Sequence, residues 1–233
     1  MTGDELKEYR VKCGLTQKQA SQRLGVSQTC LSLVESNKRR LTESLKQKLV
    51  KKLNASPTEL PARFKDYKVG KVSDERLTAE LARLGYPGFS HWKPSGPKNP
   101  ADVLLSALNS ASRDARLVEA LPWLLFTFPE LDWSNVVKTA KVFDLQNRLG
   151  FVTNVAKRMA ERCGNHNAAL ILESVEARLE GSKLAKEETL CKETMTRAER
   201  EWLKTQRPEE AKHWNLLTDL SPQHLNRDYY ATT

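Results

Sequence analysis

The chain has 233 residues, of which 39% are hydrophobic and 7% aromatic, and this composition is typical of a folded globular protein rather than a disordered one. No apolar run approaches the ~20 residues that a helix needs to cross a bilayer. The charged N-terminal segment also lacks an apolar signal region. We therefore expect a cytoplasmic protein that does not bind a membrane.

The positive charge is concentrated near the N-terminus. Residues 1–68 hold fifteen Lys and Arg against seven Asp and Glu, a net charge of +8, whereas the whole chain carries +9. A general solubilising surface would distribute these cations more evenly. The distribution predicts a polyanion partner for the N-terminal part and a protein or small-molecule partner for the rest.

Residues 3–13 predict a first helix, with Leu6 and Cys13 on its inner face and Gly14 ending it. We expect Cys13 to be a small core residue. The four cysteines, at positions 13, 30, 163 and 191, share no close spacing and form no CxxC pair. This pattern favours reduced thiols that pack in the interior over disulfides or a metal site.

A second helix begins after Thr16, because Thr16 and Gln19 have the spacing of a capping box. Ala20 and Leu24 lie four residues apart on one face of this helix. Gly25 supplies the left-handed residue that ends it.

A third helix follows, capped by Ser27, with Leu31 and Val34 pointing inward. The residues left on its outer side are Gln28, Thr29, Ser32 and Leu33.

This pair of helices resembles the helix-turn-helix of the phage-repressor family, also called XRE or Cro-like. The family's sequence frame is matched at Thr16, Gln17, Leu24, Gly25, Val26, Ser27, Leu31, Ser32 and Glu35. An exposed amphipathic hairpin without a binding role is the alternative. A frame of this length, with both helix periods correct, favours a lambda-repressor-like domain that binds double-stranded DNA.

The resemblance implies which residues contact DNA, because in this family the second helix of the pair lies in the major groove and the first crosses the backbone. A glutamine can bond adenine N6 and N7, and a threonine or leucine can pack on a thymine methyl. The implied base contacts are Gln28, Thr29, Ser32 and Leu33. The implied phosphate contacts, which should weaken steeply with salt, are Gln17, Asn37, Lys38, Arg39 and Arg40.

A fourth helix, starting at Thr42, would close a domain of residues 1–65, since Leu41, Leu45, Leu49 and Leu53 recur every four residues. Its outer lysines form either a solvated face, which is the default, or direct phosphate contacts. They are Lys46, Lys48, Lys51 and Lys52.

Residues 66–99 predict one helix, capped by Ser73 and ended by Gly85, followed by a linker rich in Pro and Gly. Phe89 and Trp92 indicate that this linker packs on another part of the chain. His91 beside Trp92 is expected to be structural rather than a ligand.

Residues 100–181 predict a bundle of antiparallel helices or a helical hairpin, so the fold class is all-α. Asn99 and Pro100 start the first helix, and Pro122 should break or kink the second. Further helices are expected over residues 134–149 and 151–164, with a last one across the Gly164 turn. A polar patch, buried for hydrogen bonding or facing a partner, is formed by Asp144, Gln146, Asn147, Arg148 and Gly150.

The tail, residues 182–233, contains a helix whose capping box is Thr196 and Glu199. Its aromatic residues either pack back on the bundle or hold a partner, since aromatic anchors are enriched at interfaces. The candidates for partner binding are Trp202, Trp214, Tyr229 and Tyr230.

We find no catalytic motif, metal-binding motif or cofactor-binding motif, and we expect no enzyme activity. Cys163 and His166 lie three residues apart, but nothing in the sequence orients them as a nucleophile and base.

Residues 100–180 resemble the C-terminal region of bacterial XRE regulators encoded beside a toxin, commonly of the nucleotidyltransferase type, which are similar to abortive-infection antitoxins. The resemblance implies a homodimeric repressor that controls its own operon and neutralises a cognate toxin protein through the helical domain. The alternative is a ligand-responsive or phage-type repressor whose helical domain only dimerises or senses a small molecule.

Overall fold

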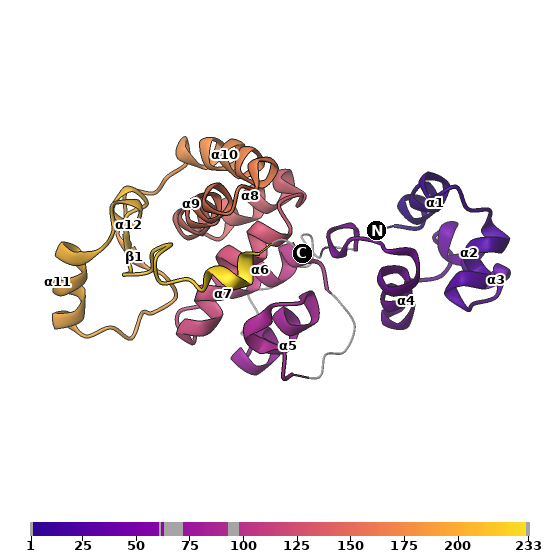
Figure 1. The fold of residues 1–233 in the computed structure, drawn as a ribbon, viewed down its shortest axis with the longest axis horizontal. Helices are drawn as coiled ribbons and strands as arrows, with labels where there is room; N and C mark the ends of the chain where they lie inside the picture. Colours follow the sequence, from indigo (N-terminus) through magenta and orange to yellow (C-terminus); the bar gives the residue numbers. More distant parts are fainter. Residues whose placement is uncertain (1, 61, 63–71, 93–97, 232–233) are drawn as a thin grey trace.

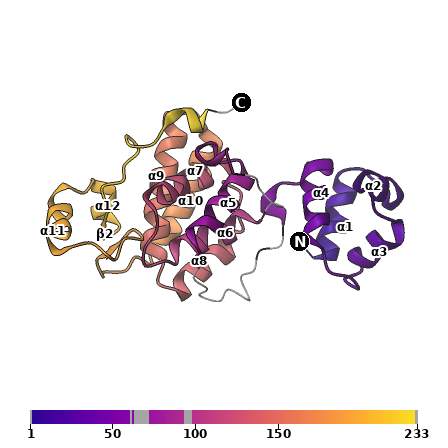
Figure 2. The ribbon, with the colours of Figure 1, turned by 90° about the horizontal axis from the view of Figure 1, so that it is seen from below.

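The computed structural model describes residues 2–60, 62, 72–92 and 98–231. These residues are mostly helical, which confirms the all-α fold class. Figures 1 and 2 show a small group of helices, α1 to α4, set apart from a larger body that contains the elements from α5 onward. Among the described helices, none combines the length and the apolar character that crossing a membrane requires.

The N-terminal group has four α-helices and one short 3-10 turn. These are α1 (Gly3–Lys12), α2 (Gln17–Leu24), α3 (Gln28–Glu35), α4 (Glu43–Leu53) and η1 (Pro57–Glu59). Their inner side chains form one hydrophobic cluster around Leu6, Leu24, Leu31 and Leu49. Each of these four leucines is at most 1% exposed.

Local capping sets the ends of these helices as predicted. Thr16 and Gln19 form the capping box of α2, and Gly25 ends that helix with a φ of 60°. The Ser27 side chain accepts a hydrogen bond from the Cys30 amide and starts α3. These bonds replace the partners that backbone groups at a helix end lack.

Cys13 is not the core residue that the sequence predicts, because its side chain is exposed. The helix ends at Lys12, and Cys13 is its C-cap rather than part of the inner face. Leu6 is buried and Tyr9 packs against the same cluster, so these two side chains fill the space under α1.

The larger body has a single hydrophobic core. Leu77 and Leu81, which precede the predicted bundle, and Trp214 and Tyr230 from the tail belong to the same core as residues 101–190. The boundaries predicted at residues 100 and 182 therefore do not separate cores. The residues between 63 and 71, where the predicted boundary at 65/66 falls, lie outside the described part.

The elements of this body run from α5 to η3. They are α5 (Asp74–Leu84), η2 (Pro87–Phe89), α6 (Pro100–Leu108), α7 (Ala115–Thr127), α8 (Trp133–Val142), α9 (Gln146–Arg162), α10 (His166–Glu180), β1 (Glu188–Thr189), α11 (Arg197–Gln206), α12 (Glu209–His213), β2 (Leu216–Leu217) and η3 (Arg227–Tyr230). The two short strands pair in parallel, with Glu188 opposite Leu216.

The structure has no break at Pro122, where a break or a kink is expected, and it places another predicted helix end elsewhere. Helix α7 continues through Pro122 without ending there. The helix predicted over residues 134–149 ends at Val142, and Asp144, with a φ of 55°, forms the turn before α9. Gly150 therefore lies inside α9 rather than between two helices.

Gly150 is required where it lies because the Trp214 ring packs against its backbone. A Cβ atom at this position would lie 2.4 Å from Trp214 Cζ3, closer than any ordinary van der Waals contact. The glycine thus serves a close approach between α9 and the tail, not a turn.

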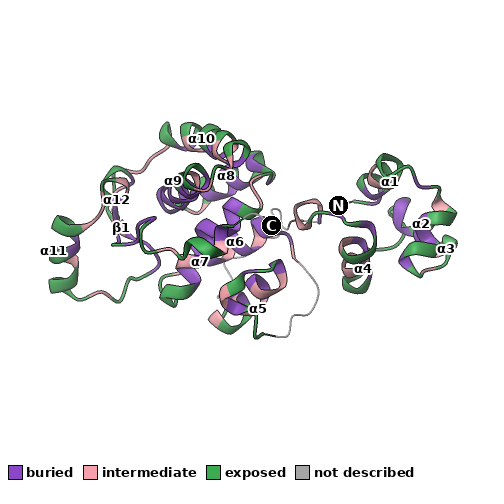
Figure 3. Cartoon of the chain, viewed as in Figure 1, coloured by how far each residue is buried: buried purple, intermediate pink, exposed green. Residues whose placement is uncertain are grey.

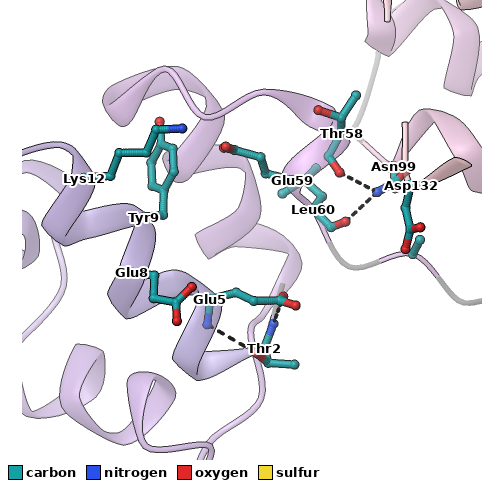
Figure 4. A pocket seen from close by; sticks show the side chains of 11 residues that line it. Thr2, Glu5, Glu8, Tyr9, Lys12, Thr58, Glu59, Leu60, Asn99 and Asp132 are labelled. Carbon is teal, nitrogen blue, oxygen red and sulfur yellow. Dashed lines mark hydrogen bonds between the residues drawn. The ribbon is translucent and has the colours of Figure 1, made fainter. Parts of the chain in front are cut away.

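The two groups of helices meet near residue 99. The Asn99 side-chain amide donates hydrogen bonds to the carbonyls of Thr58 and Leu60, at 2.9 and 2.6 Å, while Asn99 Oδ1 caps α6. Figure 4 shows these bonds at one side of an open crevice of about 710 Å³ that is also lined by Tyr9 and Glu59. The Asn99 side chain thereby joins the end of the N-terminal group to the start of α6.

Candidate nucleic-acid interface

Helix α3 is held by its inner face. Leu31 and Val34 are 1% and 3% exposed, and they pack in the same cluster as Ala20 and Leu24 of α2. Side chains three and four residues apart share a helix face. Because Leu31 and Val34 are buried, the opposite face of α3 is exposed to solvent. Figure 3 shows this pattern as exposed ribbon on the outer side of α3.

The four residues predicted to contact bases all lie on that outer face. Gln28 and Thr29, in the first turn, are exposed, and so are Ser32 and Leu33 in the following turn. Leu33 is 37% exposed, and it gives the face one apolar contact point. The arrangement offers an amide, two hydroxyls and a methyl-bearing side chain along one narrow surface.

A buried carboxylate lies directly behind this face. Glu35 is 5% exposed and accepts two hydrogen bonds from Arg10, from Nε at 2.7 Å and from Nη2 at 3.1 Å. The bond to Glu35 raises the pKa of the Arg10 guanidinium. Arg10 also donates to the Leu15 carbonyl at 2.9 Å, so this pair fixes α1 against α3 and against the start of α2.

Gln17 connects the buried pair to the exposed face. Its side-chain Nε2 donates to Glu35 Oε2 at 3.1 Å, and its Oε1 accepts a hydrogen bond from Gln28 Nε2 at 3.3 Å. Gln17 is half-buried. The chain of bonds from Arg10 through Glu35 and Gln17 therefore holds the Gln28 amide in place.

Three of the predicted phosphate contacts are free to meet a duplex. Lys38, Arg39 and Arg40 follow α3 directly, and all three side chains are exposed. Arg39 makes one weak contact, from Nη1 to Cys30 Sγ at 3.5 Å. They place a group of cations at the C-terminal end of the outer face.

Asn37 has a different role from the predicted phosphate contact. Its Oδ1 accepts a hydrogen bond from the Gly3 amide at 2.6 Å, and its Nδ2 donates to Asp4 at 2.8 Å. With a φ of 58°, Asn37 also forms the left-handed turn after α3. Both ends of its side chain are thus used to hold the start of α1.

Two of the four outer lysines of α4 are bonded within the chain, and the other two are exposed. Lys46 pairs with Glu43 at 2.7 Å, and Lys48 donates to the Gly25 carbonyl at 3.0 Å, where it caps the end of α2. Lys51 and Lys52 are exposed and form the solvated face that the sequence predicts by default.

The polar patch of α9 is buried and bonded within the chain. The Arg148 guanidinium donates to the carbonyls of Leu108 and Ser110, at 2.9 and 2.7 Å, and to Glu188 at 3.1 Å. Asn147 exchanges two hydrogen bonds with the Leu184 backbone. The sequence left open whether this patch is buried for hydrogen bonding or faces a partner. Asn147 and Arg148 are buried and hydrogen-bonded, while Asp144 is exposed.

Only one of the four candidate partner-binding aromatics is well exposed. Trp202 of α11 is 57% exposed, whereas Trp214 and Tyr230 are 0% and 2% exposed and belong to the core. Tyr229 is half-buried, with its ring centroid 5.5 Å from that of Tyr86. The prediction that Trp214 and Tyr230 bind a partner is therefore wrong. The tail packs back on the bundle, and both side chains belong to the core.

Residues 6–60 match a family model described as helix-turn-helix. A search of curated proteins and a search of solved structures find no match to the chain. The matched range begins inside α1 and runs past η1, so it includes α2, α3 and α4 and with them the exposed face of α3. Residues 6–60 are therefore an XRE-like helix-turn-helix, the DNA-binding domain of a transcription regulator.

Proposed function

We propose that this protein is a sequence-specific repressor that recognises an operator through Gln28, Thr29, Ser32 and Leu33. The observation that carries the proposal is the exposed face of α3, whose position is fixed by a buried inner face and by the Gln17–Gln28 hydrogen bond. Side chains on such a helix reach base edges in the major groove. The cations Lys38, Arg39 and Arg40 contribute affinity through the phosphates.

The protein acts as a homodimer on a near-palindromic operator in this proposal. A single module of this size buries too little surface for a specific complex. Two copies place their recognition helices in successive major grooves, so the half-sites lie about one helical turn apart.

The helical body, in the same proposal, binds and neutralises a cognate toxin protein, so the chain is the antitoxin of a two-gene system and not an enzyme. Supporting this are the resemblance of residues 100–180 to such antitoxins and the exposed Trp202 on α11. An exposed tryptophan is the residue type most enriched at interface hot spots.

A second candidate function is favoured by a cavity beside Trp202. It measures about 620 Å³ and has Val118, Leu203 and Leu220 in its walls. This volume is in the range of small-molecule sites. A repressor that senses a small molecule through the helical body would use this cavity in place of a toxin contact.

Selection of bound duplexes from a random library, with the full chain, tests the DNA-binding part. The expected result is enrichment of a two-fold related motif with half-sites roughly 10 base pairs apart. Equal binding of all duplexes, with no enriched motif, would rule out sequence-specific recognition. Enrichment of a single, unrepeated motif would support base recognition but would contradict binding as a dimer.

Co-purification with the product of an adjoining reading frame tests the antitoxin part. We expect a stable complex that Trp202→Ala weakens, and rescue of growth when both proteins are produced. Failure to associate and to rescue growth would leave the small-molecule repressor as the better account.

A further inference from the structure

A small cavity in the helical body is surrounded by aromatic rings from segments far apart in the sequence. It measures about 270 Å³ and is lined by Tyr86 and Phe89 around η2, by Tyr229 and Tyr230 of η3, and by Glu119 of α7. Figure 1 shows η3 lying over α7, and the two elements are in contact. The chain thus brings three separate segments together around one space.

The aromatic walls are preformed. The Tyr86 ring centroid lies 5.1 Å from that of Phe89 and 5.5 Å from that of Tyr229, both in edge-to-face contact. Behind the cavity, Tyr230 packs edge-to-face on Phe126 at 5.1 Å. Rings held in this way present fixed, electron-rich surfaces, and such surfaces attract organic cations.

Glu119 supplies a negative charge beside these rings. It is half-buried, and within the described part of the chain it has no ion-pair or hydrogen-bond partner. Burial, together with the charges of Tyr229 and Glu119, raises the pKa of Tyr86 to about 12. Arg116 and His224 also line the cavity, but both are exposed to solvent.

The Tyr230 hydroxyl is the second unmatched group. Tyr230 is 2% exposed, and its hydroxyl is buried with no hydrogen-bond partner among the described residues. A buried hydroxyl without a partner costs stability relative to one that is bonded. Because this hydroxyl is closed to solvent, Tyr230 contributes its ring rather than its hydroxyl to the cavity wall.

We propose that this cavity binds a small organic cation, an alkylammonium ion free in solution. Glu119 balances its charge, and the aromatic rings contact its alkyl groups. Because the site joins η2, α7 and η3, a bound ion holds the tail against the bundle. The inference does not depend on what the helix-turn-helix binds.

The test uses the unmodified full chain with three probes: choline, n-propylammonium and 3,3-dimethyl-1-butanol, which has the shape of choline without its charge. Thermal unfolding and ligand-observed NMR report binding, with sodium chloride matching the ionic strength. Both cations should raise the melting temperature in a saturable way, as expected for a ligand that binds the folded state. The neutral alcohol should not. Equal stabilisation by the alcohol, or no saturable shift with either cation, would overturn the proposal without any variant.

A variant of Glu119 then tests the charged group. Glu119→Gln should weaken the binding of both cations by roughly tenfold or more, because the substitution removes the negative charge and keeps the shape of the side chain. The matched control, Glu173→Gln on the exposed side of α10, should leave binding unchanged. Undiminished binding by a folded Glu119→Gln chain would contradict the assignment.

Discussion

The Gln28 side-chain amide donates a hydrogen bond to Gln17 Oε1, with 3.3 Å between the two atoms. Gln17 in turn donates to the buried Glu35 carboxylate. One of the exposed residues proposed to contact bases is thus oriented by a chain of bonds that begins in the domain interior. A side chain held before binding loses less conformational entropy when it meets a base.

Removing Gln17 tests this orientation. We predict that Gln17→Ala lowers operator affinity by about threefold to tenfold, the range expected when the one hydrogen bond that orients Gln28 is lost. Because Gln17 is uncharged, the dependence of affinity on salt concentration should keep its slope. Fluorescence anisotropy over a salt series measures both quantities. An unchanged operator affinity would show that the Gln17–Gln28 bond has no role in binding.

The exposed cations after α3 should behave differently. Arg39→Ala and Arg40→Ala should each weaken binding to all sequences alike and lower the salt slope by about one, since each removes one phosphate contact. The control is Lys138→Ala, an exposed cation on α8. The same salt series distinguishes the two cases, and a loss of discrimination between operator and random DNA would assign these arginines to bases instead.

The buried pair of Arg10 and Glu35 should stabilise the N-terminal domain. Glu35→Gln leaves Arg10 without a countercharge, and we expect it to lower the free energy of unfolding by about 3 kcal/mol. Glu8→Gln, an exposed position on α1, should have little effect. Urea unfolding followed by far-ultraviolet circular dichroism measures the change, because all five tryptophans lie beyond residue 91 and report on the helical body instead. Equal stability of the two variants would show that the ion pair is not needed.

Gly150 should be indispensable to the helical body. Gly150→Ala places a methyl group 2.4 Å from the Trp214 ring and should cost about 2 kcal/mol, as other overpacked cores do. Gly181→Ala is the matched control, because no heavy atom lies within 4 Å of its Cβ position. Tryptophan fluorescence during urea unfolding follows both variants. If the two alanine variants are equally stable, the packing of Trp214 on α9 is not as described.

The sequence predicted the helix-turn-helix well because the signals there are local. The capping pair Thr16 and Gln19, the left-handed Gly25 and the cap at Ser27 each act within a few residues, and all three occur as predicted. The exposure of Gln28 follows from the inward period of Leu31 and Val34. Nothing beyond this short stretch is needed to deduce it.

The errors concern residues whose role is set by distant parts of the chain. Asn37 is bonded to Gly3 and Asp4, more than thirty positions away, so its sequence neighbours suggested a cation-rich phosphate site instead. Gly150 looked like a helix end, but it accommodates Trp214 from the tail. A glutamate in a buried helical position, such as Glu35, is a signal for an internal partner, because a buried carboxylate needs a countercharge.

The operator affinity of a Gln28→Ala and Thr29→Ala double variant tests the central claim most directly. The comparison uses the selected operator and a random duplex, with Thr205→Ala and Gln206→Ala on α11 as a control that removes the same two residue types from another exposed helix. Each lost base contact is worth about 1–3 kcal/mol, so the account predicts that specific binding disappears while salt-sensitive binding to random DNA remains. A double variant that binds its operator as tightly as the unmodified chain would contradict recognition through α3.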